Sequence, residues 1–413
     1  MKKSVRFLAA LLMVAMLVAG CSTTPPSETP ASSAPASTNA ASSTPAAAGS
    51  DNVAVPGDEK VYIGLVAAQT GTNKATGEMA INGATLAVEQ VNAAGGILGK
   101  QIELVIADEI DNLDASVNAS ARLLSDPRIS VIIGSQYSQN ILATMPQILE
   151  KKISFIALGS NDAIAAEGNP YVWQPRNHDA GNARILSTYA HDTLGIKNPA
   201  VLCSTLPNAQ GPGQAVRDYY KSQYNLPITD DRYFEYNEEE KNFAPIIAQI
   251  ANSGADGLLS FGNQQPHALI SKAIADNGLD IPRLANAPIT SSIVIDNAGK
   301  AANGWFSTTD WAYTLDTEVG AAFEKAYFEK YGKHTEGSMA YTYDSVYLVK
   351  KAMETANDCY DREAINTGFG NIKDMEGVLG TYNAQRDHGF LSEVFLVQIE
   401  DGKIMLKDKV KYR

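Results

Sequence analysis

The sequence contains little cysteine and little histidine, and it has no excess of positive charge. Three Cys in 413 residues are too few for a disulfide scaffold. The five His residues show no metal-ligand spacing; they are His178, His191, His267, His334 and His388. The formal charge is −13, whereas a nucleic-acid partner needs a basic surface to meet its phosphates. The composition therefore argues against a disulfide-stabilised domain, a metal site and a nucleic-acid partner.

Sequence motifs of common enzymes are also missing. The chain has no Gly-x-Ser-x-Gly elbow, no P-loop, no His-Glu-x-x-His and no Cys-x-x-Cys. For the pair His178-Asp179, a structural hydrogen bond is favoured over a catalytic role. We therefore expect a protein that is not an enzyme, with no catalytic residue and no cofactor.

Long apolar runs are confined to the N-terminus. Three basic residues precede the apolar segment 7–19, which has the length of a signal peptide and is short for a membrane span. This segment leads into Leu17-Val18-Ala19-Gly20-Cys21, which resembles a bacterial lipobox, where the Cys becomes the lipidated first residue. An ordinary cleavage site beside an incidental Cys is the alternative. We expect a signal peptide over 1–20 and a lipid anchor to the cell membrane at Cys21.

The next segment, 21–58, is made almost wholly of Ser, Thr, Pro and Ala. It has too few apolar side chains to bury and predicts a disordered tether. Loss of Lys2, Lys3 and Arg6 with the signal peptide would take the formal charge from −13 to about −16. The sequence thus predicts a globular, acidic body held beside a membrane on a flexible segment.

Apolar strand patterns and amphipathic helix patterns alternate along the body. The first series of strands is predicted at 61–66, 102–106, 129–133 and 153–156. A second series is predicted at 200–203, 257–261, 281–285 and 304–307. Long helices at 319–331 and 339–356 follow, and strands at 394–398 and 403–410 finish the chain. This alternation predicts an α/β protein with two lobes of similar plan, each built on a mainly parallel sheet.

One stretch, Ile129 to Asn140, has the features of a ligand-binding turn. Its apolar strand stops at Gly134, and a short polar turn then opens a helix. Backbone N–H groups at such a turn point to the carboxyl edge of the sheet, where open α/β sheets bind ligands. We expect this turn to hold a polar, anionic group of a small solute. Ser138 is the main candidate contact, although it is also a candidate N-cap for a helix beginning at Gln139.

Several motifs together resemble the branched-chain amino-acid binding proteins of bacterial ABC importers, which are type I solute-binding proteins. They are Gly83-Ala84 before Asn92 to Ile97, the Val131 to Gly134 turn, and Glu376-Gly377 to Tyr382. The similarity extends over roughly Lys60 to Lys409. It implies two Rossmann-like lobes joined by three crossovers, with the ligand in the cleft between them. It also implies a monomer whose partners are a small-molecule solute and the permease and ATPase subunits of an importer.

The resemblance also implies how the chain divides into lobes. The N-terminal lobe would comprise 59–179 and 312–377, and the C-terminal lobe 180–311 and 378–413. In the family, the turn after the third strand holds the ligand carboxylate. The corresponding residues of this turn here are Tyr137 and Ser138. The turn after the fourth strand corresponds to Gly159, Ser160 and Asn161.

The second lobe departs from the family pattern. Family members that bind amino acids place aromatic side chains and a Glu there. Gln210 and Gln264, with Asn263 beside it, stand at the aromatic positions, and Asn286 or its neighbour Ala287 stands at the Glu position. Without that Glu, a buried ammonium would lack an anion, whereas amides match amide, urea, hydroxyl or carbonyl groups. The expected ligand is therefore a small polar solute: an amino acid, an amide, a urea-like compound or a carboxylate.

Some alternatives stay open at this point. A sensing module for a membrane receptor would share the fold, and an extracytoplasmic hydrolase is a further possibility. Thr76 replaces an aromatic residue of the family in the first loop. Cys203 lies in an apolar strand and is expected as a buried thiol, although a bridge to Cys359 is possible from the sequence. Tyr341 is expected in core packing or hinge support.

Overall fold

The computed structural model describes residues 54, 59–110, 112–315, 317–391 and 393–411. All of them lie in one compact unit, Gly49–Arg413. The predicted signal peptide, the lipidation site Cys21 and the predicted tether, apart from Ala54, lie outside the described residues. In these ranges, no helix combines the length and the apolar character that crossing a membrane requires.

The first sheet is parallel throughout and has five strands. In spatial order they are β2 (Ile102–Asp108), β1 (Val61–Ala67), β3 (Ile129–Ile133), β4 (Ser154–Ile156) and β5 (Val172–Trp173). Every residue of β1 and β3 is buried, as expected for central strands covered on both faces. The predicted first series of strands is confirmed, and β5 is an addition too short for its periodicity to be read.

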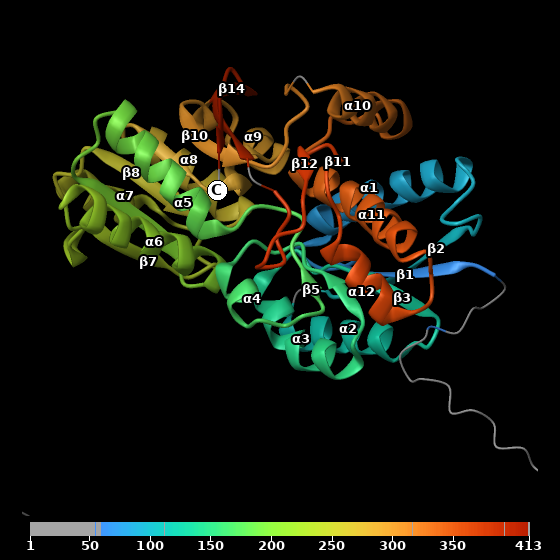
Figure 1. Ribbon diagram of the computed structural model, residues 1–413. Coiled ribbons are helices and arrows are strands. Elements are labelled where there is room, and N and C mark those ends of the chain that lie inside the picture. Colours follow the sequence, from blue (N-terminus) through green and yellow to red (C-terminus); the bar gives the residue numbers. More distant parts are fainter. Residues whose placement is uncertain (1–53, 55–58, 111, 316, 392, 412–413) are drawn as a thin grey trace, which may run out of the picture. The chain divides into compact units, whose positions relative to one another are not determined.

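Helices of two separate chain segments cover this sheet (Figure 1). The early segment contributes α1 (Lys74–Ala93), α2 (Leu113–Ser125), α3 (Ser138–Lys151) and α4 (Asp162–Ala166). The late segment contributes α11 (Gly337–Ala356) and α12 (Arg362–Gly370). Its first helix, α10 (Glu318–Tyr331), lies beside α1, where Lys330 pairs with Glu89. Gly83 lets α1 approach α11 closely, because a Cβ there would lie 2.3 Å from the Met339 carbonyl oxygen. The long predicted helices thus return to the first lobe and pack on α1.

The second sheet has seven strands and is mixed. In spatial order they are β14 (Lys403–Lys411), β13 (Glu393–Glu400), β10 (Trp305–Thr309), β9 (Arg283–Ala285), β8 (Gly257–Phe261), β6 (Pro199–Ser204) and β7 (Tyr233–Tyr236). The last two strands of the chain form an antiparallel hairpin and pair antiparallel to β10. The edge strand β7 was not predicted, since Glu235 in it is exposed and its apolar signal is weak.

The helices of the second lobe follow its strands in alternation. They are α5 (Asp179–Thr188), the π-helical turn η1 (Tyr189–Thr193), α6 (Pro207–Tyr224), α7 (Ala244–Asn252), α8 (Gln264–Asp276) and α9 (Ser292–Ala298). Three short 3₁₀ segments complete the lobe: η2 (Asp230–Arg232), η3 (Ala287–Thr290) and η4 (Gly299–Ala302). The expected fold class, two Rossmann-like α/β lobes, is confirmed.

The chain passes between the two sheets three times. It leaves the first sheet after β5, leaves the second after β10, and returns to β13 after the small hairpin of β11 (Met375–Glu376) and β12 (Thr381–Tyr382). At the last connection, the Asn177 side chain donates a 2.7 Å hydrogen bond to the Glu393 carbonyl. The residue numbers at which the lobes divide stay a prediction.

Both cysteines of the body are buried free thiols. Burial raises the pKa of Cys203 to about 12 and that of Cys359 to about 11. The possible Cys203–Cys359 bridge is therefore not present, and the buried thiol expected for Cys203 is confirmed.

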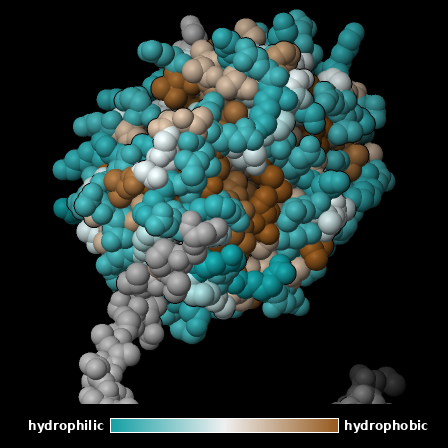
Figure 2. Space-filling model, turned by 90° about the vertical axis from the view of Figure 1, so that its right-hand side faces the viewer, coloured by the Kyte–Doolittle hydropathy of each residue, from teal (hydrophilic) through white to brown (hydrophobic). Residues whose placement is uncertain are grey.

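Tyr341 is buried on α11. Figure 2 shows a face on which hydrophilic residues predominate around a central hydrophobic area.

Candidate functional site

A polar cleft lies between the two lobes, with a cavity volume of ≈ 100 Å³. Its wall combines turns that follow strands of both sheets with the start of α11. The two turns on the first-lobe side contribute Tyr137, Ser138 and Ser160, and the second lobe contributes Asn263, Gln264 and Asn286. These six residues belong to the nine that the sequence singled out. The structure therefore brings both predicted halves of the site together.

The turn after β3 is set by close backbone packing. Gly134 has φ +123°, and a Cβ on it would lie 2.3 Å from the Val66 carbonyl oxygen. Its N–H donates a 2.9 Å hydrogen bond to the carbonyl of Ile156 in the neighbouring strand β4. Any side chain here would separate β3 from β1, which explains why the strand ends in Gly.

Ser138 joins the two first-lobe turns. It is 2 % exposed, and its hydroxyl oxygen accepts a 3.3 Å hydrogen bond from the Asn161 N–H. Ser138 is the first residue of α3, and the N-cap position belongs to Tyr137, which makes no side-chain cap bond. The alternative interpretation of Ser138 as the N-cap of this helix is therefore wrong.

Three of the nine candidates do not line the cleft: Gly159, Asn161 and Gln210. Gly159 packs behind Ser138, and a Cβ on it would lie 2.7 Å from the Ser138 hydroxyl oxygen. The Asn161 amide donates a 2.7 Å bond to the Pro207 carbonyl in the other lobe. The Gln210 amide donates a 2.8 Å hydrogen bond to the Ser204 carbonyl at the end of β6. Their positions favour supporting roles for the wall and for lobe contact.

The amides of the second lobe are partly engaged with the protein. Asn286 forms two 3.2 Å bonds with the backbone of Gly262, one as donor and one as acceptor. Asn263 accepts a 2.9 Å bond from the Asn208 side chain. These bonds orient both side chains at the cleft wall. Thr76 also lines the cleft, and its carbonyl accepts a 3.2 Å bond from Gln136.

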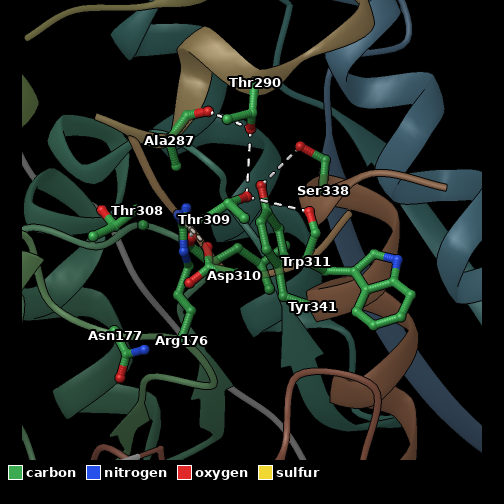
Figure 3. Close-up of polar contacts among 12 residues, drawn as sticks. Arg176, Asn177, Ala287, Thr290, Thr308, Thr309, Asp310, Trp311, Ser338 and Tyr341 are labelled. Carbon is green, nitrogen blue, oxygen red and sulfur yellow. Dashed lines mark hydrogen bonds and ion pairs between the residues drawn. The ribbon is translucent and has the colours of Figure 1, made fainter. Parts of the chain in front are cut away.

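An ion pair at the crossovers was missed by sequence reasoning. Arg176 follows β5, Asp310 follows β10, and Arg176 Nη2 lies 2.5 Å from Asp310 Oδ2. The guanidinium carbon also lies 4.8 Å from the centre of the Tyr341 ring. Figure 3 shows the three side chains grouped below Thr309 and Ser338. All three residues line the cleft, so its wall includes a buried cation with its own anion.

Asp179, which the sequence indicated only as part of a structural pair with His178, also lines the cleft. It begins α5, is 7 % exposed, and its N–H donates 2.8 Å to the Ser160 carbonyl. Burial raises the pKa of Asp179 to about 7, against the opposing effects of Ser160 and Arg176. Its Oδ2 atom is buried without a hydrogen-bond partner. The neighbouring His178 Nδ1 lies 3.8 Å from the Asp162 carboxylate.

A further carboxyl group, Glu336, lies where the two lobes meet. Ser291 of the second lobe donates a 2.8 Å hydrogen bond to Glu336 Oε2 just before α11. Burial raises the pKa of Glu336. Arg176, Asp179, Asp310 and Glu336 each stand directly after a strand or near the start of a helix, which is the one signal that the sequence offered. Many polar residues of exposed loops carry the same signal. Among the described residues, no group of His, Cys, Asp and Glu could hold a metal ion.

Comparison with known proteins of similar sequence indicates one protein family. The family model described as periplasmic binding protein matches residues 60–403. A Leu/Ile/Val-binding protein homolog 3 of Brucella melitensis is 23% identical over 350 residues, covering 84% of this chain and 93% of the relative.

Two solved structures share the fold but differ in the ligand that they contain. The branched-chain amino acid binding protein LivJ of Streptococcus pneumoniae, in complex with isoleucine, has a TM-score of 0.78 at 24% identity and covers 85% of this chain and 99% of its own. A solute-binding protein of R. palustris, in complex with benzoate, has a TM-score of 0.76 at 19% identity and covers 85% and 96%. At these identities the likeness concerns the fold, and the fold alone does not specify the ligand.

Proposed function

Since this chain belongs to the periplasmic binding protein family, we propose that it captures a small polar solute and delivers it to the permease of an ABC importer. Family membership implies an extracytoplasmic location and a role in binding rather than in catalysis. Solute binding occurs in the cleft and is coupled to closure of the lobes about the three crossovers. The permease then recognises the closed form, which the bound solute stabilises by contacts with both lobes.

The observation that carries this proposal is the polar wall shared by the two lobes. Ser138 and Ser160 from one lobe lie in the same cleft as Asn263 and Asn286 from the other. A solute that contacts both sides is held most strongly when the lobes are closed. The wall supports a solute with a carboxylate or similar polar group near Ser138, as an amino acid, amide, urea-like compound or carboxylate would provide.

Asp179 adds to the ligand argument. The Glu expected for an ammonium group is replaced by Asn286, which had counted against an amino acid. Asp179 offers a buried carboxylate oxygen at the same cleft, so the cleft has an anion for a protonated nitrogen after all. An amine-containing solute thereby becomes the favoured ligand among the four classes.

The proposal includes the lipid anchor at Cys21, a monomeric state, and lobes of 59–179 with 312–377 and 180–311 with 378–413. Lipidation predicts that the full-length protein fractionates with membranes and that Cys21→Ser releases it.

A thermal-shift screen of polar solutes identifies ligands, because binding to the native state raises the melting temperature.

Small-angle scattering then tests closure. A ligand found in the screen should lower the radius of gyration of the protein. Tight binding of a ligand without any change in the radius of gyration would contradict the clamp mechanism.

A further inference from the structure

We propose that the cleft selects solutes with a net positive charge, such as a basic amino acid, a diamine or a guanidine compound. This inference rests on the proposed function and narrows its ligand class. It predicts that an α-amino acid with a neutral apolar side chain binds more weakly than one whose side chain carries a second nitrogen cation. The argument depends on the charges in the cleft wall and on their partners.

Carboxyl groups outnumber cations in this wall. Among the described residues that line the cleft, the ionisable acids are Asp179, Asp310 and Glu336, and the one base is Arg176. Asp179 is 7 % exposed and Asp310 is 5 % exposed, so solvent screens neither charge effectively. With all four groups ionised, the wall has two more negative charges than positive ones. Burial raises the pKa of all three acids, so each gains most from a ligand cation, which stabilises its ionised form.

The pairing inside the wall leaves carboxylate oxygens available. Arg176 is already bound to Asp310 through Oδ2, and Glu336 is bound to Ser291, which is neutral. Asp179 Oδ2 and Asp310 Oδ1 are both buried without a hydrogen-bond partner. The Ser160 side chain hydrogen-bonds to the Asp179 carboxyl and the Asn177 N–H to that of Asp310, so one oxygen of each carboxyl is left for a donor from the ligand.

Energetics favour a ligand cation at this place. A buried carboxylate without a counter-ion is unfavourable and shifts toward its protonated form. A zwitterion brings one cation and one anion and leaves the excess of negative charge unchanged, and a simple carboxylate increases it. A solute with two protonated nitrogens, or with one ammonium and one guanidinium, reduces the excess and donates several N–H groups at once.

A matched ligand series tests the inference on the unmodified full-length protein. L-Lysine and L-norleucine share the α-amino acid group and an unbranched side chain, but only lysine ends in an ammonium. Agmatine supplies two cations without a carboxylate, and glutarate supplies two anions. We expect calorimetry at pH 8 to give an affinity for lysine or agmatine at least about 30-fold above that for norleucine, with glutarate weakest, as for a buried charge pair.

The outcomes separate this inference from the proposed function. Tighter binding of norleucine or glutarate than of both cations would overturn the charge selection and leave solute capture intact. Absence of binding by all four compounds, together with no hit among further polar solutes of any charge, would contradict the proposed function itself.

Variants of the wall provide a second readout. Asp179→Asn and Glu336→Gln each remove one negative charge and should lower the affinity ratio of lysine to norleucine by about 30-fold. Asp256→Asn is the matched control, because the Asp256 carboxylate accepts bonds from the backbone N–H groups of Lys197 and Asn198 and does not line the cleft. An unchanged ratio in both wall variants, with folding verified by circular dichroism, would contradict the inference.

Discussion

The side-chain amide of Asn161 donates a 2.7 Å hydrogen bond to the backbone carbonyl of Pro207, which joins the two lobes beside the cleft. Asn161 also caps α4, since its Oδ1 accepts a 2.8 Å bond from the Ala163 N–H. The residue that the sequence indicated as a ligand contact thus forms a direct bond between the lobes.

Replacement of Asn161 by Asp should therefore weaken closure more than folding, because Asp keeps the cap and loses the donor to Pro207. We expect about fivefold weaker solute binding, the effect of one hydrogen bond of about 1 kcal/mol. Calorimetry measures the affinity. Asn297→Asp is the matched control, because its amide makes a similar 2.7 Å bond to Ile293 within helix α9, and its solute affinity should not change.

Removal of the Ser138 hydroxyl tests the first-lobe turn. Ser138→Ala should weaken solute binding by about 1–3 kcal/mol if the hydroxyl contacts the solute, and it should also lower the stability of the solute-free protein, because the buried Asn161 N–H loses its acceptor. Ser130→Ala is a useful contrast, because its hydroxyl donates 2.7 Å to the buried Cys359 carbonyl. That variant should lose stability and keep its affinity. Equal affinities of wild type and Ser138→Ala would reduce Ser138 to a support for the Asn161 turn.

The pH dependence of binding follows from Asp179. Burial raises the pKa of Asp179 to about 7 from 3.8. Between about pH 4 and 7 this carboxyl group is therefore mainly protonated in the folded protein and mainly ionised in the unfolded chain. The corresponding stability is present below pH 4 and is lost as the pH rises through 7.

A ligand amine prefers ionised Asp179, so its affinity should rise by up to about tenfold per pH unit below pH 7 and level off above it. Calorimetry in buffers of different ionisation enthalpy would detect the released proton. Asp179→Asn should flatten this profile, and a slope that survives the substitution would assign the effect to another group.

Asp344 should matter for stability. Its carboxylate accepts hydrogen bonds from the backbone N–H groups of Val378 and Leu379, each at 3.0 Å, and from the Tyr382 hydroxyl at 2.7 Å. Asp344→Ala leaves two buried N–H donors without an acceptor and should lower the free energy of unfolding by about 3 kcal/mol or more. Urea denaturation measures this loss. Tyr382→Phe removes one bond only and should cost about 1 kcal/mol; equal losses would contradict the assigned role of Asp344.

Local patterns in the sequence were sufficient for most of the fold. Continuous apolar runs such as 61–66 and 129–133 indicate buried strands because a strand covered on both faces has no polar side. Long amphipathic segments likewise indicate α10 and α11. The strands β5 and β7 were missed because one has two residues and the other lies at a sheet edge.

The candidate site was predictable only in part. Six of its nine predicted residues line the cleft, because strand ends in a parallel sheet gather at one edge whatever the loops contain. Asn161 and Gln210 have the same sequence signal, yet their amides bind backbone carbonyls instead of facing the cavity. Which way an amide points depends on neighbours from other chain segments, and periodicity carries no information on those.

The sequence by itself determined the α/β class, the order of strands and helices, and the position of the turn at Gly134, since each of these follows from residues close together in the chain. Only the tertiary structure decided the charges of the cleft. Arg176 and Asp310 lie on different crossovers, and they meet because three separate passages of the chain converge between the lobes. The same convergence buries Asp179 and raises its pKa, an effect of desolvation that exists only once the lobes are packed.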